Sequence, residues 1–189
     1  MKHFVITLTR QFASNGRPIA QAMSRELGIE FYDRDIVEAT AARLGLSIRE
    51  ISDSEDTHST SFFRSLYPLG TGNLSVQDEL FQTQSNIIRD LADKESCIIV
   101  GRCADYILDT ASIPALNVFI HANMEYRKAH VLERYGKTNV PIEKRLRKKD
   151  KGRKTYYRYY TDREWGQSNM TAAAELTADS DDRIHRNTS

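Results

Sequence analysis

Two consecutive stretches decide the fold, the run His3-Phe4-Val5-Ile6-Thr7-Leu8-Thr9 and the segment Arg10-Gln11-Phe12-Ala13-Ser14-Asn15-Gly16-Arg17 that follows it. The run is short, mostly apolar and β-branched, and it predicts a buried strand. The segment is polar and predicts a loop. Pro18 then stands where a helix can begin, because a missing N–H costs little at the first helical position. The apolar residues that follow at helical spacing predict an amphipathic helix ending at Gly28.

The same alternation of strand and helix continues along the chain. Further strands are predicted at 29–32, 97–100 and 116–120, and further helices at 33–44 (with Asp33 as its cap), 75–91, 104–108, 124–135 and 141–160, the last as one helix or a helix pair. This pattern indicates βαβ units and a parallel sheet, whose ligands bind beyond the carboxyl ends of the strands. The loops 10–17, 101–105 and 121–125 are therefore expected at the ligand edge.

Charge is segregated along the chain, although the formal net charge of all 189 residues is only +1. Residues 1–126 carry a net −6 and residues 164–189 a net −3, whereas the block 127–163 carries 14 Lys/Arg and 4 Asp/Glu, a net +10. A block of this charge favours phosphate-bearing partners.

Several classes of protein are disfavoured by the composition. No apolar run reaches the roughly 18 residues of a membrane span, and the N-terminal run is too soon interrupted by Arg10 to be a signal peptide. Cys97 and Cys103 make no disulfide framework. We therefore expect a cytoplasmic protein with no membrane partner.

The loop 10–17 lies between a strand and a helix, which is where a phosphate finds converging N–H donors and a nearby cation. Gly16-Arg17 stands where a P-loop has its Gly-Lys. The match to that motif is incomplete, because Gln11 replaces the first glycine, Arg17 the lysine and Pro18 the magnesium-binding hydroxyl residue. The alternative is an ordinary strand-to-helix turn.

Two further features place cations near the expected ligand edge. Gly101-Arg102 directly follows a buried strand, so its guanidinium either binds phosphate or carboxylate or pairs with an acidic helix end. The basic block 144–160 interleaves cations with four tyrosines. It is read as a lid that closes over a transferring phosphoryl group, as a solvated helix face, or as a nucleic-acid surface.

In this order, these loops resemble the cytidylate kinase-like family, relatives of bacterial cytidylate kinases within the P-loop nucleoside monophosphate kinases. The matching stretches are Ile6–Phe12 with Gly16-Arg17 and Ile19-Ala20; Gly28–Arg34; Ile99–Leu108; Val118–Ile120 with Arg127; and Asp150-Lys151 with Arg153, Tyr156-Tyr157, Tyr160-Thr161 and Trp165-Gly166. The resemblance covers about residues 3–166, apart from 52–75.

The resemblance implies a three-layer P-loop NTPase-type α/β fold, with a central parallel sheet and a basic helical lid at 137–163. It also implies ATP with Mg²⁺ as phosphoryl donor and a nucleoside monophosphate or similar small acceptor. By position, the resemblance assigns binding of the donor phosphates to Ser14, Asn15, Gly16 and Arg17, and binding of the acceptor to Tyr32, Asp33, Arg34, Gly101 and Arg102. It assigns the arginines of the lid to Arg147, Arg153 and Arg158, and a metal ligand to Asp105.

Two departures from the family pattern lead to further expectations. The family loop resembles Gly-Ser-Gly-Gly-Arg, so a non-glycine residue here must accept any positive φ, which Asn15 tolerates better than most. The tail 167–189 lacks the apolar strand expected after Gly166, and its alanines favour one weak helix. We therefore expect a kinase-like domain over 1–166, with a mobile insertion at 52–75, and a divergent, disordered tail. The last strand would be missing or irregular, and the exposed sheet edge would favour a homo-oligomer.

Three functions remain open from the sequence. The first is an ATP-dependent kinase of the cytidylate kinase-like type. The second is a non-catalytic nucleotide-binding module on the same fold, favoured by Ala13, Asn15 and Pro18. The third is a nucleic-acid binder using 144–160, which Asp150 and the acidic remainder of the chain disfavour.

Overall fold

The computed structural model describes residues 3–45, 76–136, 140–166 and 172–176. The predicted insertion 52–75 and most of the predicted tail 167–189 lie outside the described residues.

The centre of the fold is a five-stranded sheet in the order β2-β3-β1-β4-β5. The strands are β1 (Val5–Arg10), β2 (Glu30–Tyr32), β3 (Cys97–Val100), β4 (Ala115–Ala122) and β5 (Ala172–Leu176). Each neighbouring pair runs parallel, with Val5 of β1 opposite Cys97 of β3 and Ala115 of β4. The predicted parallel sheet is confirmed.

The strand β5 corrects one expectation. The sequence predicts that the alanine-rich segment forms a weak helix and that the last strand is missing or irregular. The segment instead pairs in parallel with β4, from Val118↔Ala172 to Ala122↔Leu176. Because pairing satisfies the backbone N–H and C=O groups along β4, that strand is internal and the edges of the described sheet are β2 and β5.

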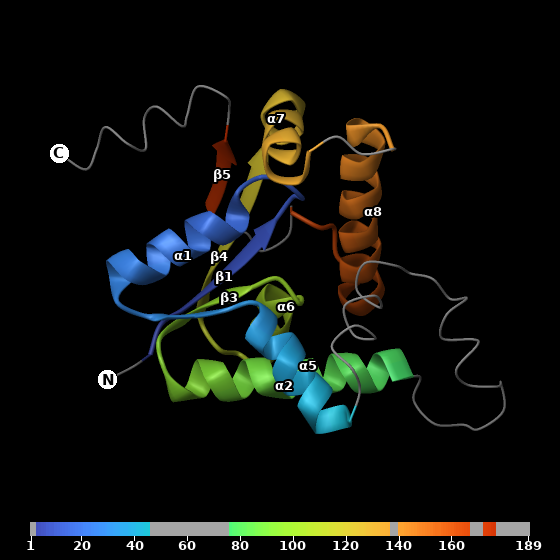
Figure 1. The fold of residues 1–189 in the computed structure, drawn as a ribbon. Helices are drawn as coiled ribbons and strands as arrows, with labels where there is room; N and C mark the ends of the chain where they lie inside the picture. The colour runs from blue at the N-terminus through green and yellow to red at the C-terminus, as the bar shows by residue number, and fades with distance from the viewer. Residues whose placement is uncertain (1–2, 46–75, 137–139, 167–171, 177–189) are drawn as a thin grey trace, which may run out of the picture.

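Helices cover both faces of the sheet (Figure 1). They are α1 (Gly16–Leu27), α2 (Arg34–Leu44), α5 (Val76–Lys94), α6 (Ala104–Thr110), α7 (Met124–Tyr135) and α8 (Ile142–Thr161). The basic segment is thus one helix rather than a pair. The helices α1 and α2 end at Gly28 and Gly45, both at φ 65°, as the glycine positions predict.

Two buried clusters show the three layers. On one face, Ile6, Leu8 and Ile98 pack with Ala20 of α1 and Tyr126 of α7. On the other face, the alternate strand residues Val5 and Ile99 pack with α5, α6 and Tyr157 of α8. Because successive side chains of a strand point to opposite faces, one buried strand supplies both clusters.

The strand order places the loop after β1 at the switch point of the sheet. The connection after β1 runs past β3 to β2, whereas the connection after β3 runs past β1 to β4, so the chain leaves the ends of these neighbouring strands in opposite directions. Ligands of open parallel sheets bind in the crevice that this reversal creates. Among the described residues, none of the helices combines the length and apolar character that crossing a membrane requires.

Candidate phosphate-binding site

The phosphate loop is the turn Gln11–Asn15 between β1 and α1. Ala13 at φ 64° and Asn15 at φ 58° both adopt the left-handed conformation, so the expectation for Asn15 is confirmed and Ala13 joins it. These reversals turn the chain into the N-terminus of α1, which begins at Gly16. The unsatisfied N–H groups and the positive dipole end of a twelve-residue helix favour an anion there.

Gly16 is required by close packing. A Cβ atom at this position would lie 2.6 Å from Cβ and 2.7 Å from Cγ of Arg10. These atoms belong to the stem of the Arg10 side chain, which cannot swing aside without moving β1. A glycine at this position therefore lets the helix start directly over the end of the strand.

Side chains of the loop hold its shape. The Ser14 hydroxyl lies 3.0 Å from the carbonyl oxygen of Gln11 and 3.2 Å from that of Ile120, so it donates inward to the backbone. The Asn15 amide donates to the hydroxyl of Tyr126 at 2.5 Å. Of the predicted donor-phosphate residues, Ser14 and Asn15 thus use their side chains to fix the loop, so any contact with a phosphate falls to their backbone N–H groups.

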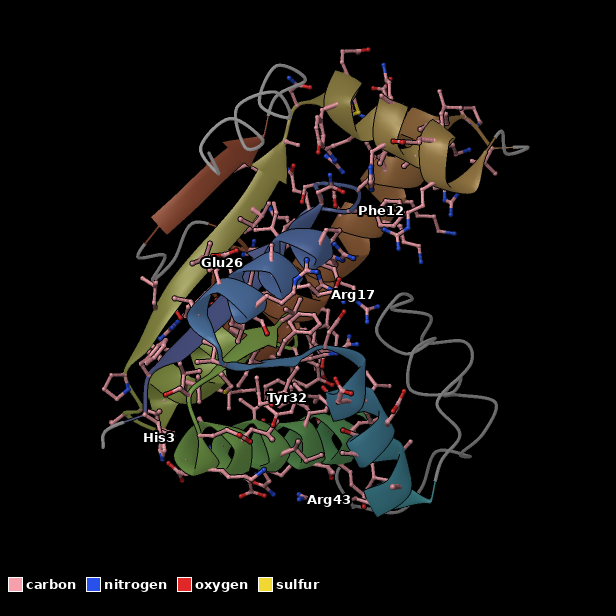
Figure 2. The ribbon with its side chains drawn as sticks, turned by 60° about the vertical axis from the view of Figure 1, so that its left-hand side comes forward. His3, Phe12, Arg17, Glu26, Tyr32 and Arg43 are labelled. Carbon is pink, nitrogen blue, oxygen red and sulfur yellow. The ribbon has the colours of Figure 1, made fainter. Side chains whose placement is uncertain are left out.

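A buried ion pair braces the loop against α7 and α8. Arg127 of α7 pairs with Asp150 of α8, and its Nε donates to the carbonyl oxygen of Phe12 at 2.8 Å. The other Asp150 oxygen accepts the N–H of Phe12 at 2.8 Å. Figure 2 shows Phe12 of the phosphate loop beside these two helices. The pair therefore holds both polar groups of one loop residue.

The loop forms one wall of a pocket of about 290 Å³. The pocket is lined by Arg10, Gln11, Phe12, Ala13, Ser14, Asn15, Gly16, Arg17, Pro18, Asp33, Arg102, His130, Arg134 and Arg153. Five of these residues are arginines and one is an acid. The arrangement suits a ligand with several negative charges, because a guanidinium binds phosphate or carboxylate oxygens in pairs.

Asp33 is the acidic residue of this pocket. Its side chain is only 7% exposed and lies 3.5 Å from Arg10 and 3.4 Å from Arg17. The sequence predicts that Asp33 caps α2, and this is wrong for its side chain, which makes no capping hydrogen bond. The carboxylate is directed toward the arginines instead.

Arg102 reaches the pocket from the end of β3, as predicted. Gly101 and Arg102 are both left-handed, with φ 77° and 60°. Burial, followed by the charge of Arg10, lowers the pKa of Arg102 to about 10, and Asp33 opposes this shift. Arg102 therefore stays charged at neutral pH and is poorly solvated, which strengthens its attraction for an anion. Gly101 packs against the Arg10 guanidinium rather than lining the pocket.

The structure brings one of the three predicted lid arginines to the pocket. Arg153 lines it and donates to the carbonyl oxygen of Arg10 at 2.8 Å. Arg147 pairs with Glu143, and Arg158 pairs with Glu164, both well exposed and outside the pocket lining. These exposed ion pairs agree with the alternative prediction that this side of α8 is a solvated helix face.

One predicted acceptor residue, Tyr32, is not among the residues that line the pocket. Tyr32 lies toward α5 in Figure 2 and donates to Glu95 at 2.8 Å. Burial, and then this hydrogen bond, raise the pKa of Tyr32. The side chain of Arg34 lies outside the described part of the structure, and only its place at the start of α2 is given.

Asp105, the predicted metal ligand, is not among the residues that line the pocket. Its carboxylate is buried in α6 and accepts the hydroxyl of Tyr157 at 2.6 Å. Burial raises its pKa, the opposite of what a bound cation requires of a ligand. In the described part of the chain, no three His, Cys, Asp or Glu residues cluster as a metal site would need.

Sequence reasoning missed several pocket residues. The sequence predicts a loop at Arg10, Gln11 and Phe12 but no role for their side chains. It predicts only a helix at His130 and Arg134. A signal exists for the last two, because positions four apart share one face of a helix. The direction of that face, however, depends on how α7 packs on the sheet.

The model of the cytidylate kinase-like family matches residues 5–181, nearly the whole chain.

The chain belongs to the cytidylate kinase-like family.

The match extends past Gly166, where the sequence resemblance was expected to stop, and so includes β5. Among the curated proteins, none matches this cytidylate kinase-like chain.

Solved structures share the fold at low sequence identity. An uncharacterized protein from Eubacterium ventriosum superposes with a TM-score of 0.67 at 22% identity, covering 98% of both chains. A gluconokinase from Sinorhizobium meliloti has a TM-score of 0.54 at 12% identity, covering 93% of this chain and 82% of its own. A shikimate kinase from Acinetobacter baumannii, in complex with shikimate, has 0.51 at 15%, covering 98% and 92%. The predicted three-layer fold of the P-loop kinases is confirmed.

Proposed function

We propose that this cytidylate kinase-like protein is an ATP-dependent phosphotransferase. It transfers the γ-phosphoryl group of ATP to a nucleoside monophosphate or a similar small acceptor bearing a phosphate or hydroxyl group. The observation that carries the proposal is the convergence of five arginines on the N-terminus of α1, at the switch point of a kinase-type fold.

Each wall of the pocket takes a role in this proposal. The backbone N–H groups of Ser14–Gly16 and the Arg17 guanidinium hold the donor phosphates. Arg153 approaches from α8 and balances charge on the group in transfer, since it already contacts the end of β1. Arg102 binds the acceptor from the end of β3. Catalysis then depends on positioning and charge rather than on a covalent intermediate.

The described residues do not fit a protein-held Mg²⁺ site. Pro18 offers no hydroxyl, and Asp105 is bonded to Tyr157 away from the pocket. Mg²⁺ commonly keeps several waters and binds through substrate phosphates. We therefore propose that the metal enters with the nucleotide, and no step is assigned to it.

The test is nucleotide binding followed by turnover. A ligand that binds only the native state raises its melting temperature. We expect ATP with Mg²⁺ to raise the melting temperature of the full chain, and Arg17→Gln to abolish most of that rise. Arg147→Gln is the matched control, because Arg147 is an exposed arginine outside the pocket lining. Absence of ATP binding by calorimetry, together with no ATP-dependent phosphorylation, refutes the proposal.

A non-catalytic nucleotide-binding module is the second candidate. It is favoured by Pro18, which lines the pocket where a P-loop presents a hydroxyl to the metal. ATP binding without release of ADP, across a panel of acceptors, would select this function over the kinase.

A further inference from the structure

Asp33 is an unusual residue for a pocket built to hold phosphates. It begins α2 directly beyond the end of β2, a position at which an aspartate side chain normally caps the helix. Its carboxylate instead points into the pocket, where it is the single acid among the described lining residues. The N–H of Asp33 itself lies 3.5 Å from the carboxylate of Asp35, and no side-chain capping hydrogen bond is made to the first turn of α2. The helix therefore does not explain the Asp33 carboxylate.

The ion pairs of Asp33 leave it room for another partner. Its oxygens lie 3.5 Å from Arg10 and 3.4 Å from Arg17, beyond the 2.7–2.9 Å of a charge-assisted hydrogen bond. Both partners are guanidinium groups, which are positively charged and only donate hydrogen bonds. An ionised carboxylate accepts hydrogen bonds and donates none. A ligand group placed here must therefore supply a hydrogen.

The neighbours of Asp33 place such a group beside the donor phosphates. Arg17 lies in the first turn of α1 beside the phosphate loop, and its Nε is 3.4 Å from Asp33, so a ligand oxygen bound by Asp33 lies next to whatever Arg17 binds. Arg102 is close enough to interact with Asp33 electrostatically and offers a partly desolvated guanidinium to an anion. One small acceptor can thus reach both residues.

We propose that the acceptor presents a hydroxyl group to Asp33 and a carboxylate to Arg102, so that the substrate class is a small hydroxy acid rather than a nucleoside monophosphate. This inference rests on the proposed phosphotransferase function and names its acceptor. A phosphate acceptor would bring a second negative charge against Asp33, which a site of this kind disfavours by like-charge repulsion. A hydroxyl group satisfies the carboxylate instead.

The reaction balances with these groups alone. The hydroxyl oxygen attacks the γ-phosphorus of ATP, a new O–P bond forms, and the bond from the γ-phosphorus to the bridging oxygen breaks to release ADP. The hydroxyl proton passes to the Asp33 carboxylate and is then lost to solvent. Such general-base transfer contributes about 10²–10⁴-fold to a rate.

The first experiment measures acceptor binding without needing turnover. With the donor site filled by a non-hydrolysable ATP analogue, calorimetry determines the affinity of CMP for the wild-type chain and for Asp33→Asn. We expect Asp33→Asn to bind CMP about tenfold more tightly or better, because the repulsion is removed. Asp35→Asn is the matched control, an exposed acid two residues away, and should leave the CMP affinity unchanged.

The second experiment measures ADP release with CMP, UMP and AMP on one side and glycerate, gluconate and shikimate on the other. We expect turnover with a hydroxy acid in preference to every nucleotide, a loss of about 100-fold or more in kcat for Asp33→Asn, and no loss for Asp35→Asn. Faster turnover of a nucleoside monophosphate overturns the inference. An Asp33→Asn variant that binds CMP with unchanged or weaker affinity also overturns the inference. This binding result tests the inference even if no acceptor turns over.

Failure of the wild-type chain to bind the ATP analogue has a different meaning. That result refutes the proposed phosphotransferase function itself, and the inference with it. Binding of the analogue with preference for CMP leaves the phosphotransferase standing and refutes only the hydroxy-acid acceptor.

Discussion

At the scale of single residues, the phosphate loop is held in a conformation that its own sequence opposes. Ala13 and Asn15 are both left-handed, and only Asn15 has a side chain that commonly accepts this conformation. The loop keeps this shape because Ser14 and Arg127 donate hydrogen bonds to backbone carbonyl groups and Asp150 accepts one from the N–H of Phe12, next to Ala13. Tertiary contacts therefore offset local strain at the site.

Ala13→Gly is expected to stabilise the protein. A left-handed alanine costs roughly 1–2 kcal/mol, whereas the extra freedom of glycine in the unfolded chain costs about 0.5–1 kcal/mol. The free energy of unfolding in urea should therefore rise by about 0.5–1 kcal/mol. Ala20→Gly, a buried position inside α1, is the control and should lower it. A fall for both variants would show that the Ala13 methyl group contributes packing that exceeds the strain.

Asp105→Asn is expected to raise stability at neutral pH. Burial raises the pKa of the Asp105 carboxyl in the folded protein. The folded state thus binds this proton more tightly than the unfolded state, so stability falls as the pH rises from the ordinary carboxyl pKa through the raised one. Asparagine has no such proton and still accepts the Tyr157 hydroxyl. Urea unfolding at several pH values should show the wild-type slope disappear in the variant, and an unchanged slope would contradict the assignment.

At the scale of secondary-structure elements, α7 and α8 position the phosphate loop. The buried Arg127–Asp150 pair joins the two helices and also holds both backbone polar groups of Phe12. The aspartate that interrupts the basic block is therefore a structural anchor of the site. The remaining charges of α8 divide between Arg153, which faces the pocket, and exposed pairs such as Arg147–Glu143.

Arg127→Met should cost far more stability than Arg147→Met. The Arg127 side chain is 5% exposed, and removing one partner of a buried pair costs about 3–5 kcal/mol. The Arg147 side chain is 69% exposed, and an exposed helix pair contributes about 0.3–0.5 kcal/mol. Urea unfolding of both variants measures the contrast. Equal losses would mean that the buried pair does not brace the loop.

At the scale of the whole molecule, β5 completes the sheet on the side of β4. Its pairing with β4 makes β4 an internal strand, and the family match includes this segment. The expected exposed edge at β4, and the self-association drawn from it, therefore lose their structural basis. The oligomeric state stays a prediction for solution measurement.

Removing residues 167–189 should destabilise the protein and promote association. The truncation takes β5 away and leaves the backbone groups of β4 unpaired, which makes an edge that attracts other strands. Removing only residues 177–189 is the control, since it keeps β5. Thermal unfolding and light scattering should show a lower melting temperature and larger particles for the first truncation alone. Identical behaviour of the two truncations would mean that β5 contributes nothing to stability.

The sequence by itself determined the order of strands and helices as far as α8, and the place of the phosphate loop. These predictions rest on local patterns, namely buried apolar runs, glycines at helix ends and the alternation of elements. Each pattern predicts a local conformation. Gly16, Arg17 and Arg102 follow from the same patterns, because a residue just beyond a parallel strand lies at the ligand edge whatever the rest of the fold does.

Only the tertiary structure decided which other side chains meet there. Asp33 turns away from its helix toward Arg10 and Arg17, and His130 and Arg134 reach the pocket from α7. The alanines of β5 have only a weak preference for a strand. They form one because they pair with backbone groups of β4 that would otherwise have no partner strand on that side. In each case, groups distant in sequence supply the deciding contacts, and a local pattern does not contain them.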